Sequence, residues 1–599
     1  MIRVSDYIVS TLYDLGVGHI FLVTGGGAMY LNDAVACHKK IKFTCNHHEQ
    51  ASVMAADSYA RITGKIGVAM VTSGPGGTNT ITGLMCAWQD STPCLIISGQ
   101  CKKKETVHEA HIPGLRQFGA LAVDILPVVK SMTKYAVVVD DPKGIRYHLE
   151  KAIYLAKNGR PGPVWLDIPV DIQGSFINVE ELKGFHPDVK SISDHDTELD
   201  KKIEKIIKLL KKARKPVIVA GNGIRIAGAV DEFNSLIAKL NIPVVSGIMG
   251  VDIIHDSHPL FVGRIGTKGE RAANMTIQNS DLIISIGSRL SVPLIGYEYE
   301  KFAPDAKKIV VDIDGTEHKK KTIKIDLLVI SDAKVFLDKL SERLNNLTFS
   351  FKSNWSNICR NLRESYPVCL PEYAKQTPLN IHHFVDKISD VMNNKDIITT
   401  DAGSAFYVVR QAIKIKKGQR LILPSSSGSM GFALPASTGA CLANKKNRVI
   451  CIVGDGSFQT NIHELQTIVY NKLPIKIFVL NNNGYLSIRN TQSLFLEKRL
   501  IGESESSGVS FPSTKKIAGA YGIKFTRISN SININNKLKK VLDSTGPEIC
   551  EIICQTNHLI IPTVSSKKLP DGKLVSTSID DMYPFLSEKE MKEIKQILS

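Results

Sequence analysis

The sequence predicts an α/β protein built from three doubly wound parallel-sheet domains. Along most of the chain, short apolar and β-branched runs alternate with segments whose apolar residues recur at helical spacing, which is the pattern of strand–helix–strand units. Two polar stretches, 190–201 and 346–376, interrupt this alternation and mark linkers between three blocks. At 599 residues, the chain is also too long for one hydrophobic core.

The first two blocks, residues 1–185 and 195–345, are expected to form an N-terminal and a central domain. In the first block, strands are predicted at 20–23, 66–71 and 164–168. In the second block, predicted strands at 217–220 and 281–286 are each followed by a glycine-containing turn. Both blocks therefore favour parallel sheets covered by helices.

The third block, residues 370–560, is expected to form a C-terminal domain, followed by a tail, 561–599, with a predicted helix at 587–598. Its clearest unit has strands at 449–453 and 475–480. The helix predicted between these strands, over 461–472, carries its apolar residues at helical spacing: Ile462, Leu465, Ile468 and Val469. Such a crossover makes the two strands parallel.

Polar residues follow both strands of this unit and predict a magnesium–diphosphate site. Asp455 and Asn482 emerge at carboxyl strand ends, where open α/β sheets bind ligands. Mg²⁺ prefers oxygen ligands, so these two side chains, with a backbone carbonyl at Gly484, could hold it beside phosphate and water. Gly454 and Gly456 let the backbone approach phosphates closely. The alternative is a generic Gly-Asp-Gly turn with a polar run after the next strand.

The net charge of +17 raises the hypothesis of nucleic-acid binding. The lysines, however, form separate clusters, and the one at 208–215 shares a helix with apolar residues that we expect to be buried: Ile206, Ile207, Leu209 and Leu210. We therefore expect a solvated basic surface that attracts anionic substrates, and no nucleic-acid partner.

Targeting and cysteine signals favour a cytoplasmic protein without a membrane partner. Residues 1–20 contain Arg3, Asp6 and Asp14, which a secretory segment would lack, and no run of about 18 uninterrupted apolar residues occurs. The eleven cysteines include no Cys-x-x-Cys pair. We expect them to be scattered reduced thiols rather than a disulfide framework or a zinc module.

Two segments near opposite ends of the chain carry a family resemblance. The run 454–483 resembles the thiamine-diphosphate signature, Gly-Asp-Gly followed by Asn-Asn after about one βα unit. Residues 44–64, which begin Thr-Cys-Asn-His-His-Glu-Gln, and the later run Thr-Ser-Gly-Pro-Gly-Gly-Thr-Asn resemble the pyrimidine-binding half of the same enzymes. The chain is identified as a member of the acetolactate synthase-like branch of thiamine-diphosphate enzymes. A homodimer or homotetramer with active sites at subunit interfaces is implied.

Glu49 matches the glutamate that faces the aminopyrimidine ring in that family. A carboxylate bonded to the ring nitrogen favours the imino tautomer, whose exocyclic nitrogen can remove the thiazolium proton. Taken alone, Glu49 could instead be a solvated acid in the first turn of a helix. Zinc ligation by His47, His48 and Glu49 is not expected, because adjacent side chains diverge.

The resemblance implies further site residues. Gly26 matches the glycine loop near the reacting carbon, although a tight strand–helix turn is the alternative. Met430 matches the wedge that bends the cofactor into a V, and a core methionine is an equal alternative. The implied cofactor-binding residues are Glu49, Gly403, Ser404, Ser429, Met430, Gly454, Asp455, Gly456, Ser457, Asn482 and Tyr485, and the implied metal ligands are Asp455, Asn482 and Gly484.

The central block resembles the domain that binds FAD in acetolactate synthases, although related thiamine enzymes keep this domain without flavin. Position 226 is Ile, so the turn Gly221-Asn-Gly223 lacks the third glycine of a dinucleotide fingerprint. The implied FAD-binding residues are Gly221, Gly223, Gly266, Thr267, Lys268, Gly287, Arg289 and Asp312.

Three departures from the family pattern concern the acceptor pocket. Leu121, Pro293 and Thr491 stand where acetolactate synthases have a glutamine, an arginine and a tryptophan. These replacements predict a roomier pocket, less suited to a small carboxylate acceptor. The closing run 565–574, with Asp-Met-Tyr-Pro-Phe-Leu after it, looks like the tails of acetolactate synthase-like proteins of surface-sugar biosynthesis.

The leading functional hypothesis is a carboligase. It would decarboxylate pyruvate or a similar 2-oxoacid and transfer the two-carbon unit to a carbonyl acceptor, with a keto-sugar as one option. Alternatives are a housekeeping acetolactate synthase of branched-chain amino-acid biosynthesis, a 2-oxoacid decarboxylase or C–C hydrolase, and a regulatory or binding module that retained the fold.

Overall fold

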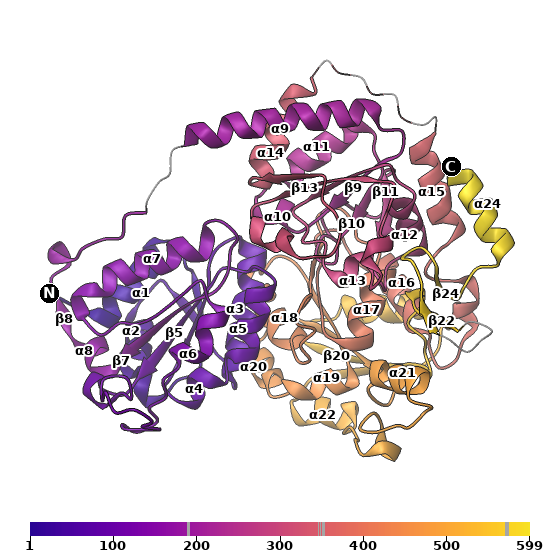
Figure 1. Ribbon diagram of the computed structural model, residues 1–599. Helices are drawn as coiled ribbons and strands as arrows, with labels where there is room; N and C mark the ends of the chain where they lie inside the picture. The colour runs from indigo at the N-terminus through magenta and orange to yellow at the C-terminus, as the bar shows by residue number, and fades with distance from the viewer. Residues whose placement is uncertain are drawn as a thin grey trace.

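The protein contains three six-stranded parallel sheets, each covered by helices (Figure 1). The computed structural model describes residues 1–187, 192–345, 347, 349, 351, 354–568 and 574–598. Most central strands are buried along their whole length, as expected where helices cover both faces of a sheet. The predicted fold class is confirmed.

The N-terminal sheet has the order β3 (Lys42–Cys45), β2 (His19–Leu22), β4 (Gly67–Val71), β5 (Cys94–Gln100), β7 (Val164–Pro169) and β6 (Tyr135–Val138). Its helices are α1 (Val4–Asp14), α2 (Met29–Cys37), α3 (Glu49–Thr63), α4 (Pro75–Thr78), α5 (Ile81–Gln89), α6 (Leu126–Val129), α7 (Ile145–Lys157) and α8 (Val170–Gly174). A short antiparallel pair, β1 (Ile2–Arg3) with β8 (Phe176–Ile177), lies beside this sheet.

The central sheet has the order β11 (Phe261–Arg264), β10 (Val244–Ser246), β9 (Pro216–Ala220), β12 (Leu282–Ile286), β13 (Lys307–Asp312) and β14 (Leu327–Ile330). Its helices are α9 (Ile192–Lys212), α10 (Gly223–Ile226), α11 (Val230–Leu240), α12 (Arg271–Gln278), α13 (Val292–Ile295), α14 (Ala333–Arg343) and α15 (Trp355–Ser365).

The C-terminal sheet has the order β16 (Arg420–Ile422), β15 (Ile397–Thr400), β17 (Val449–Gly454), β18 (Lys476–Asn481), β20 (Glu548–Ile553) and β19 (Lys524–Ile528). Its helices are α16 (Ile381–Val391), α17 (Gly403–Ala412), α18 (Ala433–Ala443), α19 (Asp455–Thr460), α20 (Glu464–Tyr470), α21 (Leu486–Phe495), α22 (Thr514–Ala520) and α23 (Ile534–Leu542).

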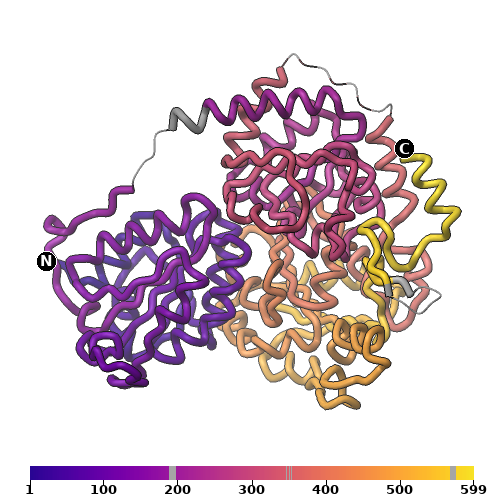
Figure 2. Tube along the Cα trace, in the orientation of Figure 1, coloured from indigo at the N-terminus to yellow at the C-terminus, as the bar shows by residue number. Residues whose placement is uncertain are grey.

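The closing segment folds back onto the central unit, where Figure 2 shows it in yellow. It comprises β21 (Thr563–Val564), β22 (Ser566–Lys568), β23 (Leu574–Ser576), β24 (Met582–Tyr583) and α24 (Glu588–Leu598). Asn274 and Arg271 of α12 donate hydrogen bonds to its backbone carbonyls. Residues 569–573 of the surface-sugar-like run lie outside the described part of the chain.

Both expected linkers contain helices. Residues 188–191 lie outside the described residues, but the chain is helical from Ile192, so a linker over 190–201 is wrong for most of its length. Leu199, Ile203, Ile206 and Leu210 form an apolar stripe that packs on the central sheet. Likewise, α15 in the second polar stretch buries Trp355 and Leu362 against the central unit. The lysines at 208, 211 and 212 are exposed, as predicted for a solvated face.

The N-terminal unit packs on the C-terminal unit through α3 and α18, which cross closely because small residues meet there. A Cβ at Gly439 would overlap the Ala55 carbonyl, so this crossing requires glycine. Arg61, which pairs with Asp57 of the same helix at 2.8 Å, donates a hydrogen bond across this contact to the Leu423 carbonyl at 2.8 Å. The two units therefore have a fixed contact within one chain.

Candidate cofactor site

Asp455 and Asn482 lie next to each other because β17 and β18 are neighbouring parallel strands that end at the same level. The Asp455 Oδ2 atom accepts hydrogen bonds from the backbone amides of Asn482 and Gly484, both at 3.1 Å. Its Oδ1 atom accepts the Gly456 amide at 2.8 Å. The predicted strand–helix–strand unit is confirmed, and it places these two residues in one buried cluster.

One buried oxygen of this cluster has no partner. The Oδ1 atom of Asn482 accepts no hydrogen bond, although a buried polar group without a partner is costly. This oxygen lies beside the buried carboxylate of Asp455. Burial raises the pKa of Asp455 to about 6, and this effect outweighs the backbone hydrogen bonds, which lower the pKa. A bound cation would satisfy the amide oxygen and favour the ionised carboxylate, so the donor set fits Mg²⁺.

Glycines shape the backbone around this cluster. At Gly454 a Cβ would meet no atom within 4 Å, so the backbone there faces open space that a phosphate could occupy. A Cβ at Gly456 would overlap the ring of Tyr485. Gly484 has a φ of +143° and lies against the backbone of Glu503, where only glycine fits. Ser457 is buried in the first turn of α19.

Glu49 begins α3 and is buried, with 9% of its surface exposed, so it is not a solvated acid. Its Oε2 atom accepts a hydrogen bond from the Asn79 side chain at 3.0 Å. Gly76 of α4 lies beside this carboxylate, since a Cβ there would be 3.7 Å from Oε1 and would overlap Thr72. Gly26 faces open space. Asn79 was not among the predicted site residues, although it closes the run Thr-Ser-Gly-Pro-Gly-Gly-Thr-Asn.

Glu464 links the N-terminal site to the C-terminal unit. Its carboxylate accepts the Asn46 side-chain amide at 2.8 Å and the His47 backbone amide at 2.9 Å. Within the described residues, no hydrogen bond joins Glu49 to Asp455, Asn482 or Gly484. Glu464 was not predicted, because nothing in its local sequence shows a partner more than 400 positions away.

The other implied cofactor residues differ in how far they are buried. Ser404 and Ser429 are buried, and the Cys86 thiol donates to Ser429 Oγ at 3.3 Å. Met430 is 41% exposed, so the alternative of a core methionine is wrong. Gly403, at φ +62°, opens α17 and lines a large cavity.

That cavity, of about 640 Å³, lies where the three units meet and falls in the roughly 300–1,000 Å³ range of cofactor sites. It brings together most residues implied for FAD, which are Gly221, Gly223, Thr267, Lys268, Gly287, Arg289 and Asp312. Cβ atoms at Gly221 and Gly223 would clash with the backbone of Gly287, so these glycines are also needed for strand packing.

Cationic side chains without a carboxylate bond gather at one end of this cavity. Burial lowers the pKa of Arg410 to about 10 and also lowers the pKa of Lys268. Arg410 donates to the backbone carbonyls of Ile265 and Lys268, and Lys268 donates to the Thr563 hydroxyl. An anionic group, such as a diphosphate, would compensate this buried charge, so the residues present fit a flavin dinucleotide.

The three departures from the family pattern do not share one wall in a single chain. Pro293 lines the large cavity, and its carbonyl accepts the Thr267 amide at 2.8 Å. Thr491 is exposed on α21, one turn after the cavity residue Ser487. Leu121 is exposed in the N-terminal unit, where a Cβ at Gly74 would lie 3.0 Å from its carbonyl oxygen.

Comparison with known proteins gives matches over most of the chain. Family models match residues 2–119 (thiamine pyrophosphate enzyme, N-terminal TPP binding domain), 203–340 (central domain) and 401–552 (C-terminal TPP binding domain). The chain is 32% identical to the acetolactate synthase large subunits of Cyanidium caldarium and of Lactococcus lactis subsp. lactis (strain IL1403), over 94% of this chain and 94% of each relative. It is 32% identical to the acetolactate synthase isozyme 2 large subunit of Escherichia coli (strain K12), over 94% of this chain and 97% of that protein.

No helix in the described ranges is long and apolar enough to cross a membrane. No group of three or more His, Cys, Asp or Glu side chains among these residues is arranged to hold a metal ion. All eleven cysteines are free thiols, as predicted.

Proposed function

Since the chain belongs to the acetolactate synthase-like family of thiamine pyrophosphate (thiamine diphosphate) enzymes, we propose that it is a carboligase. It decarboxylates pyruvate or a similar 2-oxoacid and transfers the two-carbon unit to a carbonyl acceptor. The observation that carries the cofactor assignment is the unpartnered, buried Oδ1 of Asn482 beside the Asp455 carboxylate. A fold retained only for binding or regulation would not need this cation site.

The chain's own residues divide the work. When bound, thiamine diphosphate supplies the nucleophilic carbon that adds to the 2-oxoacid. Asp455, Asn482 and the carbonyl of Gly484 hold Mg²⁺ and through it the diphosphate. Glu49, oriented by Asn79, holds a proton between its carboxylate and the aminopyrimidine nitrogen. Met430 projects from the chain surface and supports the bent cofactor.

The active site is proposed to form between two subunits of a homodimer or homotetramer. Glu49 and Asp455 have separate hydrogen-bond partners within one chain. Large apolar side chains are also exposed in both units that carry the site, including Phe118 and Leu121 in the N-terminal unit and Phe495 in the C-terminal unit. Contact between subunits would cover these side chains and bring Glu49 of one subunit to Asp455 of its partner.

The acceptor is proposed to be larger than pyruvate, with a keto-sugar as the leading option. Leu121, Pro293 and Thr491 remove polar, cationic and aromatic groups that suit a short 2-oxoacid. A housekeeping acetolactate synthase is the second candidate, because every relative compared above is named as a large subunit of an acetolactate synthase. The free thiols fit a reducing compartment, and we propose the cytoplasm.

FAD is proposed as a further bound cofactor in the 640 Å³ cavity. The cavity's size, its half-buried Lys268 and its buried Arg410 support this. Titration of the purified protein with FAD and with riboflavin, followed by flavin fluorescence, shows whether the cavity binds a flavin and whether binding needs the diphosphate. Tight binding of FAD alone is expected, because riboflavin lacks the diphosphate. Binding of neither would remove flavin from the proposal.

Product identification tests the carboligase directly. The purified protein is incubated with ¹³C-labelled pyruvate, thiamine diphosphate, Mg²⁺ and a panel of acceptors that includes 2-oxoacids, aldehydes and keto-sugars. Mass spectrometry should detect a product in which one acceptor has gained two labelled carbons from pyruvate. Labelled acetaldehyde alone would instead indicate a decarboxylase.

A further inference from the structure

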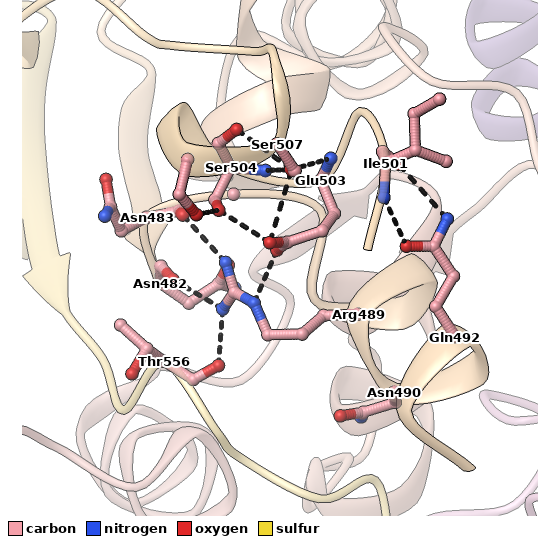
Figure 3. Close-up of polar contacts among 12 residues, drawn as sticks. Asn482, Asn483, Arg489, Asn490, Gln492, Ile501, Glu503, Ser504, Ser507 and Thr556 are labelled. Atoms are coloured by element: carbon pink, nitrogen blue, oxygen red, sulfur yellow. Dashed lines mark hydrogen bonds and ion pairs between the residues drawn. The ribbon is translucent and has the colours of Figure 1, made fainter. Parts of the chain in front are cut away.

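Arg489 lies on the carbonyl side of the turn that carries the proposed metal ligands. Its guanidinium donates to the backbone carbonyl of Asn482 at 3.2 Å and to that of Asn483 at 2.9 Å (Figure 3). It also donates to the carbonyl of Thr556, which follows the end of β20. One side chain of α21 therefore fixes this turn to the neighbouring strand.

Asp455 holds the same turn from its amide side. Its carboxylate accepts the amides of Asn482 and Gly484, whereas Arg489 donates to the carbonyls of Asn482 and Asn483. The peptide between Asn483 and Gly484 is held from both sides, because its carbonyl accepts from Arg489 and its amide donates to Asp455. It lies between the two proposed ligand residues Asn482 and Gly484, so its orientation constrains the backbone that carries both of them.

Glu503 completes this arrangement from a separate loop. Its Oε2 atom accepts from Arg489 Nε at 2.5 Å, and its Oε1 atom accepts the Ser504 hydroxyl at 2.6 Å (Figure 3). Its backbone carbonyl accepts the Tyr485 amide at 2.7 Å. Arg489 and Glu503 are both buried, so each charge depends on the other. Burying two charges costs desolvation free energy, which only close, well-oriented contacts such as these can offset.

We propose that the ion pair of Arg489 and Glu503 is a positioning device for the cation site. Arg489 orients the metal-binding turn, and Glu503 orients Arg489. Neither residue touches the cation or the reacting atoms. The pair acts as metal-ligand supports do elsewhere, where loss of an outer-shell partner weakens metal binding about 10–100-fold. The inference rests on the proposed magnesium and thiamine diphosphate site and adds two residues that no local motif marks.

The test is the Mg²⁺ concentration needed for half-maximal binding of thiamine diphosphate, measured by calorimetry. Arg489→Lys keeps the positive charge but cannot reach three carbonyls and a carboxylate together. Glu503→Gln keeps an acceptor for Arg489 but removes the compensating charge. Both variants should raise the half-maximal Mg²⁺ concentration about 10–100-fold. Saturating Mg²⁺ should restore cofactor binding in both, because the ligands themselves remain.

Arg448→Lys is the matched control. Arg448 forms a partly buried ion pair with Asp396 at 2.6 Å in the same sheet, but at the amino ends of β15 and β17. It should lower the melting temperature and leave the Mg²⁺ requirement unchanged. If Arg489→Lys does not fold, Glu503→Gln carries the test alone. A folded Glu503→Gln or Arg489→Lys with a Mg²⁺ requirement within about twofold of wild type overturns the inference, since an outer-shell role costs more. Wild type that binds no thiamine diphosphate at any Mg²⁺ concentration overturns both the inference and the proposed cofactor site.

Discussion

The Asp455 carboxylate bonds to the backbone amide of Asn482 at 3.1 Å, although 27 positions separate the two residues. Adjacent parallel strands bring them together, and the buried amide oxygen of Asn482 remains free for a cation. The strand ends that create this contact also form the edge at which α/β sheets bind ligands. The fold therefore places the proposed metal ligands where a cofactor would bind.

Replacing Glu49 with Gln should slow activation of the cofactor by about 10²–10⁴-fold, the usual contribution of a positioned acid–base group. The amide keeps the size of the side chain but cannot share a proton with the aminopyrimidine. Hydrogen–deuterium exchange at the thiazolium carbon measures this step, and cofactor binding should be retained. An unchanged exchange rate in Glu49→Gln would remove Glu49 from the proposed role.

Binding of Mg²⁺ with thiamine diphosphate should weaken at acidic pH. Burial raises the pKa of Asp455 to about 6, so below that pH a proton competes with the cation. Affinity should be constant above about pH 7 and should fall roughly tenfold per pH unit below about pH 5, as for competition with one proton. Titrations at several pH values, with Asp455→Ala as reference, measure this. An affinity that does not change between neutral and acidic pH would contradict this competition between the proton and the cation.

The metal-free protein should respond to pH in the opposite sense. The folded state holds the Asp455 proton more tightly than the unfolded chain does. The stability from this group is therefore fully present below the ordinary value of 3.8 and is lost as the pH rises through about 6. Denaturant unfolding without cofactor should show this loss in wild type, and Asp455→Ala should lack that part of the pH dependence.

Subunits that carry different site mutations should complement each other. Glu49→Gln and Asp455→Ala chains, co-expressed with different affinity tags, can be isolated as mixed dimers. If Glu49 of one subunit meets Asp455 of its partner, one of the two sites is intact, so about half of wild-type activity is expected, whereas each variant alone is nearly inactive. Inactive mixed dimers would place both residues of a site in the same chain.

Thr491→Trp should shift acceptor preference towards pyruvate. The indole would fill space beside the acceptor and exclude a large carbonyl compound, because a pocket discriminates by unfavourable as well as favourable contacts. Pyruvate decarboxylation, which depends on Glu49 and the cofactor, should continue and serves as the internal control. The ratio of acetolactate to the larger product measures the shift. Faster acetolactate formation in wild type, with no change in the variant, favours the ordinary synthase.

The strand–helix–strand unit around the metal site could be predicted because its strands are mostly apolar and are buried on both faces. The boundaries of helices were harder to predict than the strands. The helix expected from 461 begins at Glu464, because α19 already occupies Asp455–Thr460 and Asn461 caps its end with a φ of −129°. The stretch expected to be a linker became α9, because its widely spaced apolar residues form a stripe only once the helix exists.

Some residues of the candidate site could be predicted from the sequence, and others could not. Asp455 and Asn482 follow strands, so topology alone brings them together. Glu464 and Glu503 could not be predicted, because their roles come from contacts with Asn46 and Arg489 that only the folded chain creates. Arg489 could not be predicted either, because the carbonyls of Asn482, Asn483 and Thr556 reach it only in the folded chain.

The most direct test of the account is calorimetric binding of thiamine diphosphate to wild type and to Asp455→Ala at saturating Mg²⁺. Asp396→Ala, which removes a buried carboxylate at the opposite end of the same sheet, is the matched control. Wild type and Asp396→Ala should bind the cofactor with similar affinity in Mg²⁺. Asp455→Ala should lose more than the roughly 10–100-fold that an outer-shell change costs, because it lacks the only anionic ligand proposed for the cation. Equal affinity of folded Asp455→Ala and wild type would show that the cation and diphosphate bind elsewhere.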